Sequence, residues 1–326
     1  MNLCFINPPV NFSVNQKIKQ AETLCNLFSE RMNKEQSKET DNRWEIWINM
    51  HKDMSENMKP ENLSIFQSHP SIAPQITGGG GHHYLKMIGD YYGQSSLDFF
   101  LKNHTESMCG KPKDIVCIDG HYISITSMRH LFHTARIKNN CDFLYNKPIT
   151  FVEIGGGFGN LSRMILQYNL CSKYYIIDHP VLHAIQAFYL QDFFHLENIA
   201  IVEGKDQYLT GSKESKIQLC SLFDYEWILD DIQKPYVLVS TMALTEIPPK
   251  GQYNYMRKLS PDLVYIFGQF ENACLGGGKS AKNQSFDNKP LIYDFGVRFH
   301  TLDYNFFGYH FEYIGRKITF YDNSIK

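Results

Sequence analysis

One segment constrains the fold of this chain most, because it joins a short apolar run to a cluster of glycines and then to a helical pattern. The run 149–154 (I-T-F-V-E-I) is rich in β-branched residues and ends at three successive glycines, 155–157. From Asn160 to Tyr168, apolar residues follow at helical spacing. This order predicts a buried strand, a tight turn and a helix, which together form the repeating unit of α/β proteins.

The rest of the C-terminal half repeats this alternation of strands and helices. Apolar strand-like runs lie at 174–177, 199–202, 217–220, 236–240 and 263–267, and helical patterns at 180–194 and 252–259. Strands that are apolar along their whole length are typical of a sheet covered on both faces. We therefore predict a doubly wound α/β sheet. Two late stretches, 309–314 and 317–321, flank Gly315-Arg316 and predict a hairpin that adds an antiparallel edge.

The N-terminal part of the chain shows helical spacing and no strong alternating strand pattern. Helices are predicted for 83–103 and for 125–139. Four successive glycines at 78–81 precede His82-His83, and this run predicts a mobile lid. These patterns divide the chain into a mainly helical cap at 1–145, which covers a substrate or mediates dimerisation, and an α/β domain at 146–326.

Composition argues against several classes of protein. The 326 residues carry 32 basic and 34 acidic side chains, a formal charge of −2, so no global field favours nucleic acid. None of the eight cysteines forms a C-x-x-C pair, which predicts reduced thiols and no metal site. The first residues lack the regions of a signal peptide, and no apolar run reaches about 18 residues. We therefore expect a cytoplasmic protein without a membrane span.

The glycine segment has the form E-x-G-x-G-x-G. Glycines permit a tight reversal and a close approach of backbone N–H groups to a ligand. The dinucleotide fingerprint G-x-G-x-x-G does not fit, because its third glycine would fall on Asn160 or Ser162. The acid of this pattern, Glu153, would repel a pyrophosphate, but its negative charge suits a cationic donor such as S-adenosylmethionine. Glu153 could contact the donor directly, or it could hold the loop in place. The candidate cofactor-binding residues of this loop are Glu153, Gly155, Gly157, Phe158 and Gly159.

A second acid, Asp178, ends the next apolar run. A carboxylate in this place can accept both hydroxyls of a ribose. The structural alternative is that Asp178, which precedes Pro180, caps the following helix. The neighbouring His179 is a candidate for contact with adenosine. Two serines at later strand ends complete the predicted cofactor site, Ser221 for the adenine and Ser240 for the donor.

At this point the sequence resembles the class I S-adenosylmethionine-dependent methyltransferases, whose motif I is similar to 153–159. The strings F-V-E-I-G-G-G-F-G-N-L-S-R (151–163) and Y-I-I-D-H-P (175–180) resemble the sugar O-methyltransferases of bacterial surface-glycan and antibiotic clusters. Further similar segments are T-E-S-M-C-G-K-P (105–112), S-M-R-H-L-F-H-T-A-R-I (127–137) and V-S-T-M-A-L-T-E-I-P (239–248). The resemblance runs from about residue 95 to the C-terminus, and Ile247 departs from it in place of a methionine.

The resemblance implies a Rossmann-like sheet of seven strands, the last one antiparallel, behind a helical cap. It also implies S-adenosylmethionine as the methyl donor. The hairpin predicted from the late apolar stretches agrees with an antiparallel last strand.

Three side chains are candidates for the chemistry of the methyl acceptor. Glu246 follows the run 236–240 and is expected to face the cofactor crevice, where it could bind a hydroxyl or remove its proton. Its structural alternative is an acid that favours a helix N-terminus. His130 and His133 lie three residues apart on one helix and could share a face toward the cleft, with imidazole as the base. Their alternative is a pair of packed helix histidines.

Other side chains of the N-terminal part are candidates for ligand contacts. Arg136 and Arg129 could bind the donor carboxylate or a substrate phosphate, or form a solvated basic face. Tyr122 could close over the donor, or pack as an ordinary aromatic.

The sequence thus predicts an enzyme that methylates a hydroxyl of a small-molecule sugar, free or nucleotide-linked. Two alternatives stay open: a methyltransferase for a non-sugar small molecule, and a non-catalytic binding module that retains the fold. The cap is also a candidate for homodimer formation.

Overall fold

The computed structural model describes residues 19, 22–26, 54, 56–77, 81–140, 149–223, 225–247, 249–269, 299–300 and 310–316. The predicted strand 317–321 and the glycines 78–80 of the predicted lid lie outside these residues. Within the part of the chain that is described, no helix is long and apolar enough to cross a membrane.

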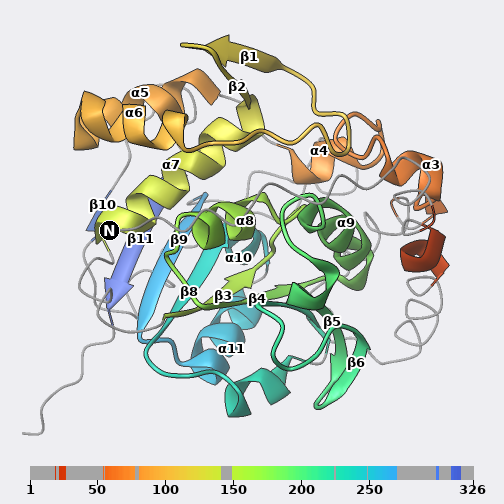
Figure 1. The fold of residues 1–326 in the computed structure, drawn as a ribbon. Coiled ribbons are helices and arrows are strands. Elements are labelled where there is room, and N and C mark those ends of the chain that lie inside the picture. The colour runs from red at the N-terminus through yellow and green to blue at the C-terminus, as the bar shows by residue number, and fades with distance from the viewer. Residues whose placement is uncertain are drawn as a thin grey trace, which may run out of the picture.

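A nine-stranded sheet of described residues lies at the centre of the fold, in the order β10-β11-β9-β8-β3-β4-β7-β5-β6 (Figure 1). Six strands are parallel, and β6, β10 and β11 are not. The bounds are β3 Thr150–Ile154, β4 Lys173–Asp178, β5 Ile199–Gly204, β6 Gln207–Thr210, β7 Ile217–Ser221, β8 Tyr236–Thr241, β9 Leu263–Gln269, β10 Phe299–His300 and β11 His310–Arg316. The predicted mainly parallel α/β fold with an antiparallel edge is confirmed.

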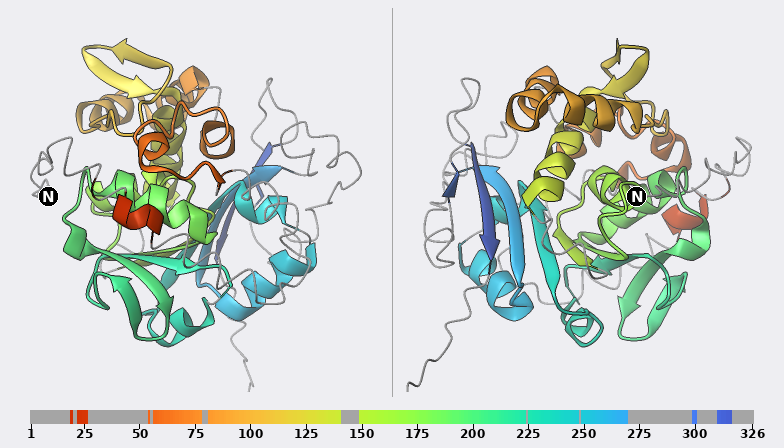
Figure 2. Two further views of the ribbon diagram at one scale, coloured as in Figure 1. Left: turned by 90° about the vertical axis from the view of Figure 1, so that its right-hand side faces the viewer. Right: turned by 60° about the vertical axis from the view of Figure 1, so that its left-hand side comes forward.

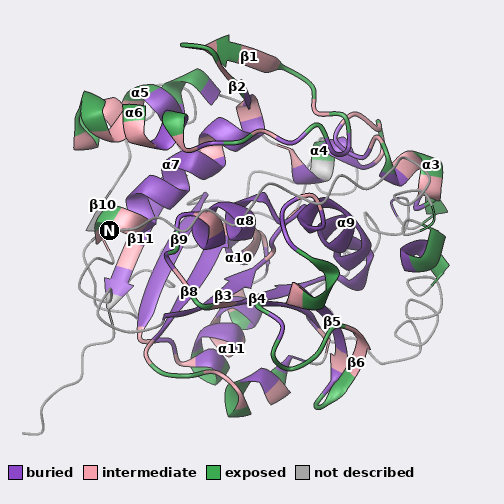
Figure 3. Cartoon of the chain, viewed as in Figure 1, coloured by how far each residue is buried: buried purple, intermediate pink, exposed green. Residues whose placement is uncertain are grey.

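Helices cover both faces of this sheet (Figures 1 and 2). One face carries α8 (Asn160–Gln167), α9 (Pro180–Leu190) and, further out, α7 (Ile125–Asn140). The other face carries α11 (Pro249–Leu259) and the short helix η4 (Glu226–Asp230), and η3 (Leu196–Asn198) leads into β5. The central strands and α8 and α9 are buried almost throughout (Figure 3). This burial explains why these strands read as continuous apolar runs.

The helical part of the chain packs onto the first of these faces. A single hydrophobic cluster joins Phe132 of α7, Ile165 of α8 and Tyr174 of β4. The other helices of this part are α3 (Pro60–Leu63), α4 (Ala73–Ile76), α5 (Gly81–Tyr92) and α6 (Gln94–Lys102). The boundary predicted at residue 145 lies outside the described residues, so the division into cap and domain stays a prediction.

Three details of the helical part differ from the prediction. The helix expected over 83–103 is two helices, because Gly93 with φ 82° interrupts it. A hairpin of β1 (Ile115–Ile118) and β2 (His121–Ser124) was not predicted, although its Asp119-Gly120 turn, with positive φ at both residues, is a common hairpin signal. Gly81, predicted as part of a lid, begins α5, where a Cβ would lie 2.9 Å from Cα of Ile125.

The predicted hairpin turn at Gly315-Arg316 is wrong. Both residues belong to β11, where they pair with Val264 and Leu263 of β9. A glycine is needed because a Cβ at residue 315 would lie 2.5 Å from Cγ2 of Val264. The described antiparallel partner of β11 on its other side is β10.

The strand β7 lies between β4 and β5 and pairs in parallel with both, although β5 precedes it in the chain. The described sheet has nine strands, more than the seven that the resemblance implied. Because of this insertion, Ser221 at the end of β7 pairs with Asp178 at the end of β4. Two polar residues that are distant in the sequence therefore meet at the carboxyl edge of the sheet.

Candidate functional site

The loop between β3 and α8 has a backbone that only glycine adopts easily. Gly155, Gly157 and Gly159 have φ values of 75°, 55° and 88°. A Cβ on Gly155 would lie 2.1 Å from Cβ of Ala243, and one on Gly156 would lie 2.5 Å from Cγ2 of Ile176. At Gly157 the nearest atom to such a Cβ would be the carbonyl oxygen of Ile76, 3.8 Å away. The loop is therefore packed from below and approachable at Gly157.

Asp178 is joined to this loop by hydrogen bonds. Its carboxylate accepts from the backbone N–H of His179 at 2.7 Å and from Nε2 of Gln186 at 2.8 Å. The backbone N–H groups of Gly156 and Gly157 also donate to it. Burial raises the pKa of Asp178 to about 7, and these hydrogen bonds oppose the rise.

The structure does not give Asp178 the alternative role of helix cap. The residue that caps α9 is His179, whose Nδ1 accepts from the N–H of Val181 at 3.4 Å. The Asp178 carboxylate instead lies at the loop. Nε2 of Gln186 donates both to this carboxylate and to the carbonyl oxygen of Gly157, so it ties the acid to the glycine turn.

Glu153 lies beneath the loop on the same face of the sheet as Asp178. It is buried, and its Oε2 accepts from the hydroxyl of Tyr174 at 3.0 Å. A Cβ on Gly156 would lie 3.3 Å from the same oxygen. Burial, with a further contribution from the charge of Asp178, raises the pKa of Glu153 to about 8. Of the two predicted roles, this geometry favours holding the loop over direct contact with a ligand.

The residues predicted to contact adenosine lie beside Asp178. The hydroxyl of Ser221 accepts from the N–H of Phe223 at 3.2 Å, and the N–H of Leu222 donates to the carbonyl oxygen of Asp178. The ring of Phe223 lies edge-on to that of His179, with centroids 5.7 Å apart. The predicted residues His179 and Ser221 are thus brought together with Asp178, and Phe223 is an aromatic neighbour that was not predicted.

Two other predicted residues have structural roles at the loop. The ring of Phe158 is buried against those of Phe66 and Tyr189, at centroid distances of 5.5 and 4.8 Å. The hydroxyl of Ser240 donates to the carbonyl oxygen of Ile154 and accepts from the N–H of Leu244. Only the backbone of Phe158 remains available to a ligand.

Two predicted contacts with the donor are not supported by the structure. Tyr122 is 67% exposed on the β1–β2 hairpin, so its ring does not cover the proposed donor site. Arg136 forms a buried ion pair with Glu312 of β11, and its Nη1 donates to the hydroxyl of Tyr92 at 2.7 Å. Its charge is already neutralised by the protein.

Glu246, the predicted acceptor residue, ends the one-turn helix α10 (Ala243–Glu246) that follows β8. Burial raises its pKa to about 7, and the charge of Arg129 on α7 opposes this rise. The residue before α10, Met242, has φ 88°, an unfavourable backbone for a side chain other than glycine. Such strain is often found at functional sites, where the surrounding structure maintains it.

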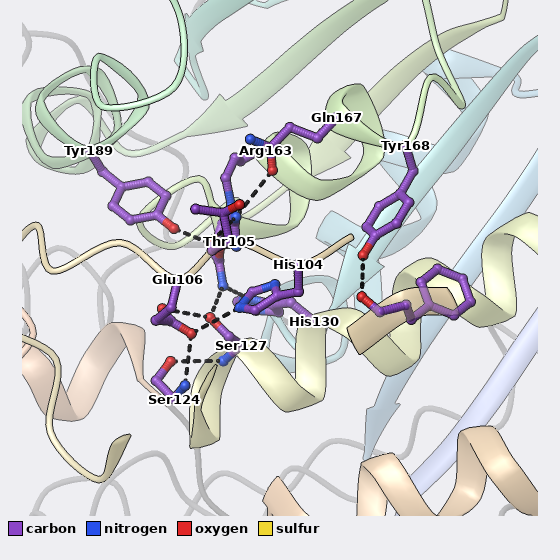
Figure 4. A network of polar contacts seen from close by, with 12 residues as sticks. His104, Thr105, Glu106, Ser124, Ser127, His130, Arg163, Gln167, Tyr168 and Tyr189 are labelled. Carbon is purple, nitrogen blue, oxygen red and sulfur yellow. Dashed lines mark hydrogen bonds and ion pairs between the residues drawn. The ribbon is translucent and has the colours of Figure 1, made fainter. Parts of the chain in front are cut away.

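A buried polar network joins α7 to the start of α8 (Figure 4). The Oδ1 atom of Asn160 accepts from Arg163 and from the hydroxyl of Tyr189 at 2.7 Å. This fixes the orientation of the Asn160 amide, so its Nδ2 donates to Nδ1 of His130 at 3.0 Å. A neutral His130 must therefore carry its proton on Nε2. It can donate a hydrogen bond, but it is not suited to act as a base.

His133 is buried in an aromatic cluster. Its Nδ1 lies 2.8 Å from the hydroxyl of Tyr265, and its ring lies 4.7 Å from that of Phe267. Burial, and then the charge of Arg129, holds the pKa values of both His130 and His133 well below the usual range. Both histidines therefore match the alternative of packed helix residues more closely than the predicted base.

Several residues of this site were missed by sequence reasoning. Glu106, in the loop before β1, accepts from the N–H of Ser124 and the hydroxyl of Ser127, at 2.7 and 3.0 Å, and contacts His104. Arg163 donates to the carbonyl oxygen of Thr105. Only the segments 105–112 and 151–163 of the resemblance pointed to these residues. In the described ranges, no three His, Cys, Asp or Glu side chains gather as metal ligands would.

Comparisons with known proteins give only distant likenesses. No family model and no curated protein matches the chain. PigF with SAH is 12% identical, with a TM-score of 0.33 over 59% of this chain, which spans only 60% of that one. Magnesium protoporphyrin IX methyltransferase from Synechocystis PCC 6803 is 10% identical, with a TM-score of 0.36 over 72% of this chain and 99% of that one.

The mitomycin 7-O-methyltransferase MmcR is likewise 10% identical, with a TM-score of 0.34 over 82% of this chain and 73% of that one. Likeness at this level does not decide function.

Proposed function

We propose that this chain is an S-adenosylmethionine-dependent O-methyltransferase. One observation carries the proposal: Asp178, at the carboxyl end of β4, is held against a turn of three positive-φ glycines that follows the adjacent strand β3. Ligands of open α/β sheets bind outside the carboxyl ends of the strands, and an acid in this place accepts the hydroxyls of a ribose.

The residues at this edge fit the proposed donor. When bound, S-adenosylmethionine supplies an electrophilic methyl group on a positively charged sulfonium. Asp178 would accept the ribose hydroxyls, and the backbone at Gly157 is open to close approach. Ser221 and Phe223, beside Asp178, would border the adenine. Glu153, which accepts a hydrogen bond from Tyr174, would support the loop from beneath.

Glu246 is the proposed general base. A hydroxyl is a weak acid, so removal of its proton as the oxygen attacks a methyl carbon lowers the barrier. A carboxyl group with a pKa near 7 is largely ionised at slightly alkaline pH and is a stronger proton acceptor than an ordinary glutamate.

For the acceptor we propose a sugar hydroxyl. The support is the resemblance of segments 105–112, 127–137, 151–163, 175–180 and 239–248 to sugar O-methyltransferases. The fold brings residues of these segments together: Glu106 contacts Ser127, Ser127 contacts Asn160, and Ala243 packs against Gly155.

The test is transfer of labelled methyl groups from S-adenosylmethionine to a panel of free sugars, nucleotide sugars and phenols. We expect label in the sugar fractions. Label in phenols alone would overturn the sugar part of the proposal. Absence of transfer together with absence of S-adenosylhomocysteine binding would overturn the methyltransferase itself and favour a non-catalytic module.

A further inference from the structure

The two arginines predicted to bind a ligand from α7 have different environments. Arg136 is neutralised by Glu312 and lies over the rings of Tyr91 and Tyr92, at 4.9 and 5.8 Å. Arg129 forms neither an ion pair nor a hydrogen bond with any described residue. Its Nε is buried without a partner, while the side chain as a whole is partly exposed.

Arg129 lies among three elements at the carboxyl edge of the sheet. Its positive charge acts to lower the pKa values of Tyr84 on α5 and of Glu246 on α10. It has the same effect on His130 and His133 of its own helix. Arg129 therefore lies close enough to the proposed base Glu246 to act on the acceptor side of the proposed site.

An unpaired guanidinium in such a place is unfavourable. A buried N–H group without an acceptor has lost its hydrogen bonds to water without replacing them, and this loss is larger when the group is charged. Glu246 does not relieve this cost, because no ion pair joins it to Arg129 and burial favours its neutral form. The fork of a guanidinium matches the oxygens of a carboxylate or a phosphate.

We propose that Arg129 binds an oxyanion carried by the methyl acceptor, so that the substrate is an anionic sugar. This inference rests on the proposed function and adds the chemical class of the acceptor. The oxyanion is either the carboxylate of a sugar acid or a phosphate attached to the sugar. Bound to Arg129, it would place the rest of the acceptor beside Glu246.

Binding measurements on the protein saturated with S-adenosylhomocysteine test this inference. The probes are inorganic phosphate, glucuronate and neutral glucose, titrated at constant ionic strength. The variants are Arg129→Gln and Arg129→Lys, and the control is Arg257→Gln, which removes an exposed arginine from α11 on the other face of the sheet.

We expect each anion to bind the control with the same affinity as wild type. Arg129→Gln should lower the affinity for both anions by about tenfold or more, which corresponds to the loss of a charge-assisted hydrogen bond. Arg129→Lys should lower it by less. Glucose should bind all variants alike and more weakly than glucuronate. Equal anion binding by Arg129→Gln and Arg257→Gln, or no anion binding by wild type, would overturn the inference while the proposed function stands.

The glucuronate and phosphate titrations compare the two sources of the oxyanion. A separate titration with S-adenosylhomocysteine distinguishes an oxyanion of the acceptor from the carboxylate of the donor, and this inference from the proposed function. We expect Arg129→Gln to bind it as wild type does. Weaker binding in this variant alone would show that Arg129 holds the donor carboxylate, which overturns the acceptor assignment. No binding by wild type would instead remove the proposed function.

Discussion

The side-chain amide of Asn160 donates to Nδ1 of His130 across 3.0 Å. Asn160 begins α8 directly after the glycine turn, and His130 lies in the middle of α7. This contact therefore links the helical part of the chain to the proposed donor loop and also sets the tautomer of the histidine.

The first prediction concerns this histidine. His130→Gln retains a hydrogen-bond donor close to the position of Nε2, so we expect activity to fall by less than about tenfold. The acid limb of the pH profile of kcat/KM should keep its midpoint, because His130 does not titrate as the base. Loss of that limb in His130→Gln would contradict the tautomer assignment.

Glu246→Gln tests the proposed base. Removing a general base lowers kcat by about 10²–10⁴-fold, and binding of S-adenosylhomocysteine should be unchanged. The matched control is Glu226→Gln on the exposed face of η4. A kcat within about threefold of wild type would show that another group removes the proton.

The same residue predicts a pH dependence. The pKa of Glu246 is raised to about 7, so its ionised, basic form is lost as pH falls through this value. The wild-type kcat/KM should therefore fall about tenfold for each pH unit below 7 and level off above it, because this ratio reports the pKa of the free enzyme. A rate that is flat between pH 5 and 8 would contradict this role.

Gly157→Ala separates backbone strain from access to the ligand. Alanine at φ 55° costs on the order of 1 kcal/mol, and Gly120→Ala at φ 81° is a matched control, because nothing lies within 4 Å of its Cβ position. We expect similar losses of thermal stability in both variants. Only Gly157→Ala should bind S-adenosylhomocysteine more weakly, and equal affinities would show that no ligand approaches residue 157.

Sequence reasoning located this loop because its signals are local. A strand, a glycine turn and a helix are specified by adjacent residues such as Ile154 and Gly155, and Asp178 follows on the next strand. The partners of Arg136 could not be predicted, because Glu312 lies 176 residues away and meets it only through the antiparallel edge of the sheet. The tautomer of His130 likewise depends on contacts among three helices. The prediction of a turn at residue 315 was wrong because the sequence alone does not distinguish a glycine required for close strand packing from a glycine required for a turn.

Glu153→Gln tests the buried acid beneath the loop. The pKa of Glu153 is raised to about 8, so between its ordinary value and pH 8 the folded protein holds a proton that the unfolded chain releases. The free energy of unfolding of wild type should fall as pH rises through this window. Glutamine removes this cost, so at pH 8 the variant should be more stable than wild type by about 1–3 kcal/mol, and equally stable near pH 4. Urea unfolding at both pH values measures the difference, and its absence would mean that Glu153 is ionised without cost.

The central claim is that Asp178 and the glycine turn bind S-adenosylmethionine. Calorimetric titration of S-adenosylhomocysteine into wild type, Asp178→Asn and the surface control Asp230→Asn tests this claim most directly. We expect saturable one-to-one binding to wild type and the control, and a loss of about tenfold or more in Asp178→Asn, which cannot accept both ribose hydroxyls as a carboxylate does. No heat of binding to wild type at millimolar ligand, or equal affinity in Asp178→Asn, would contradict it.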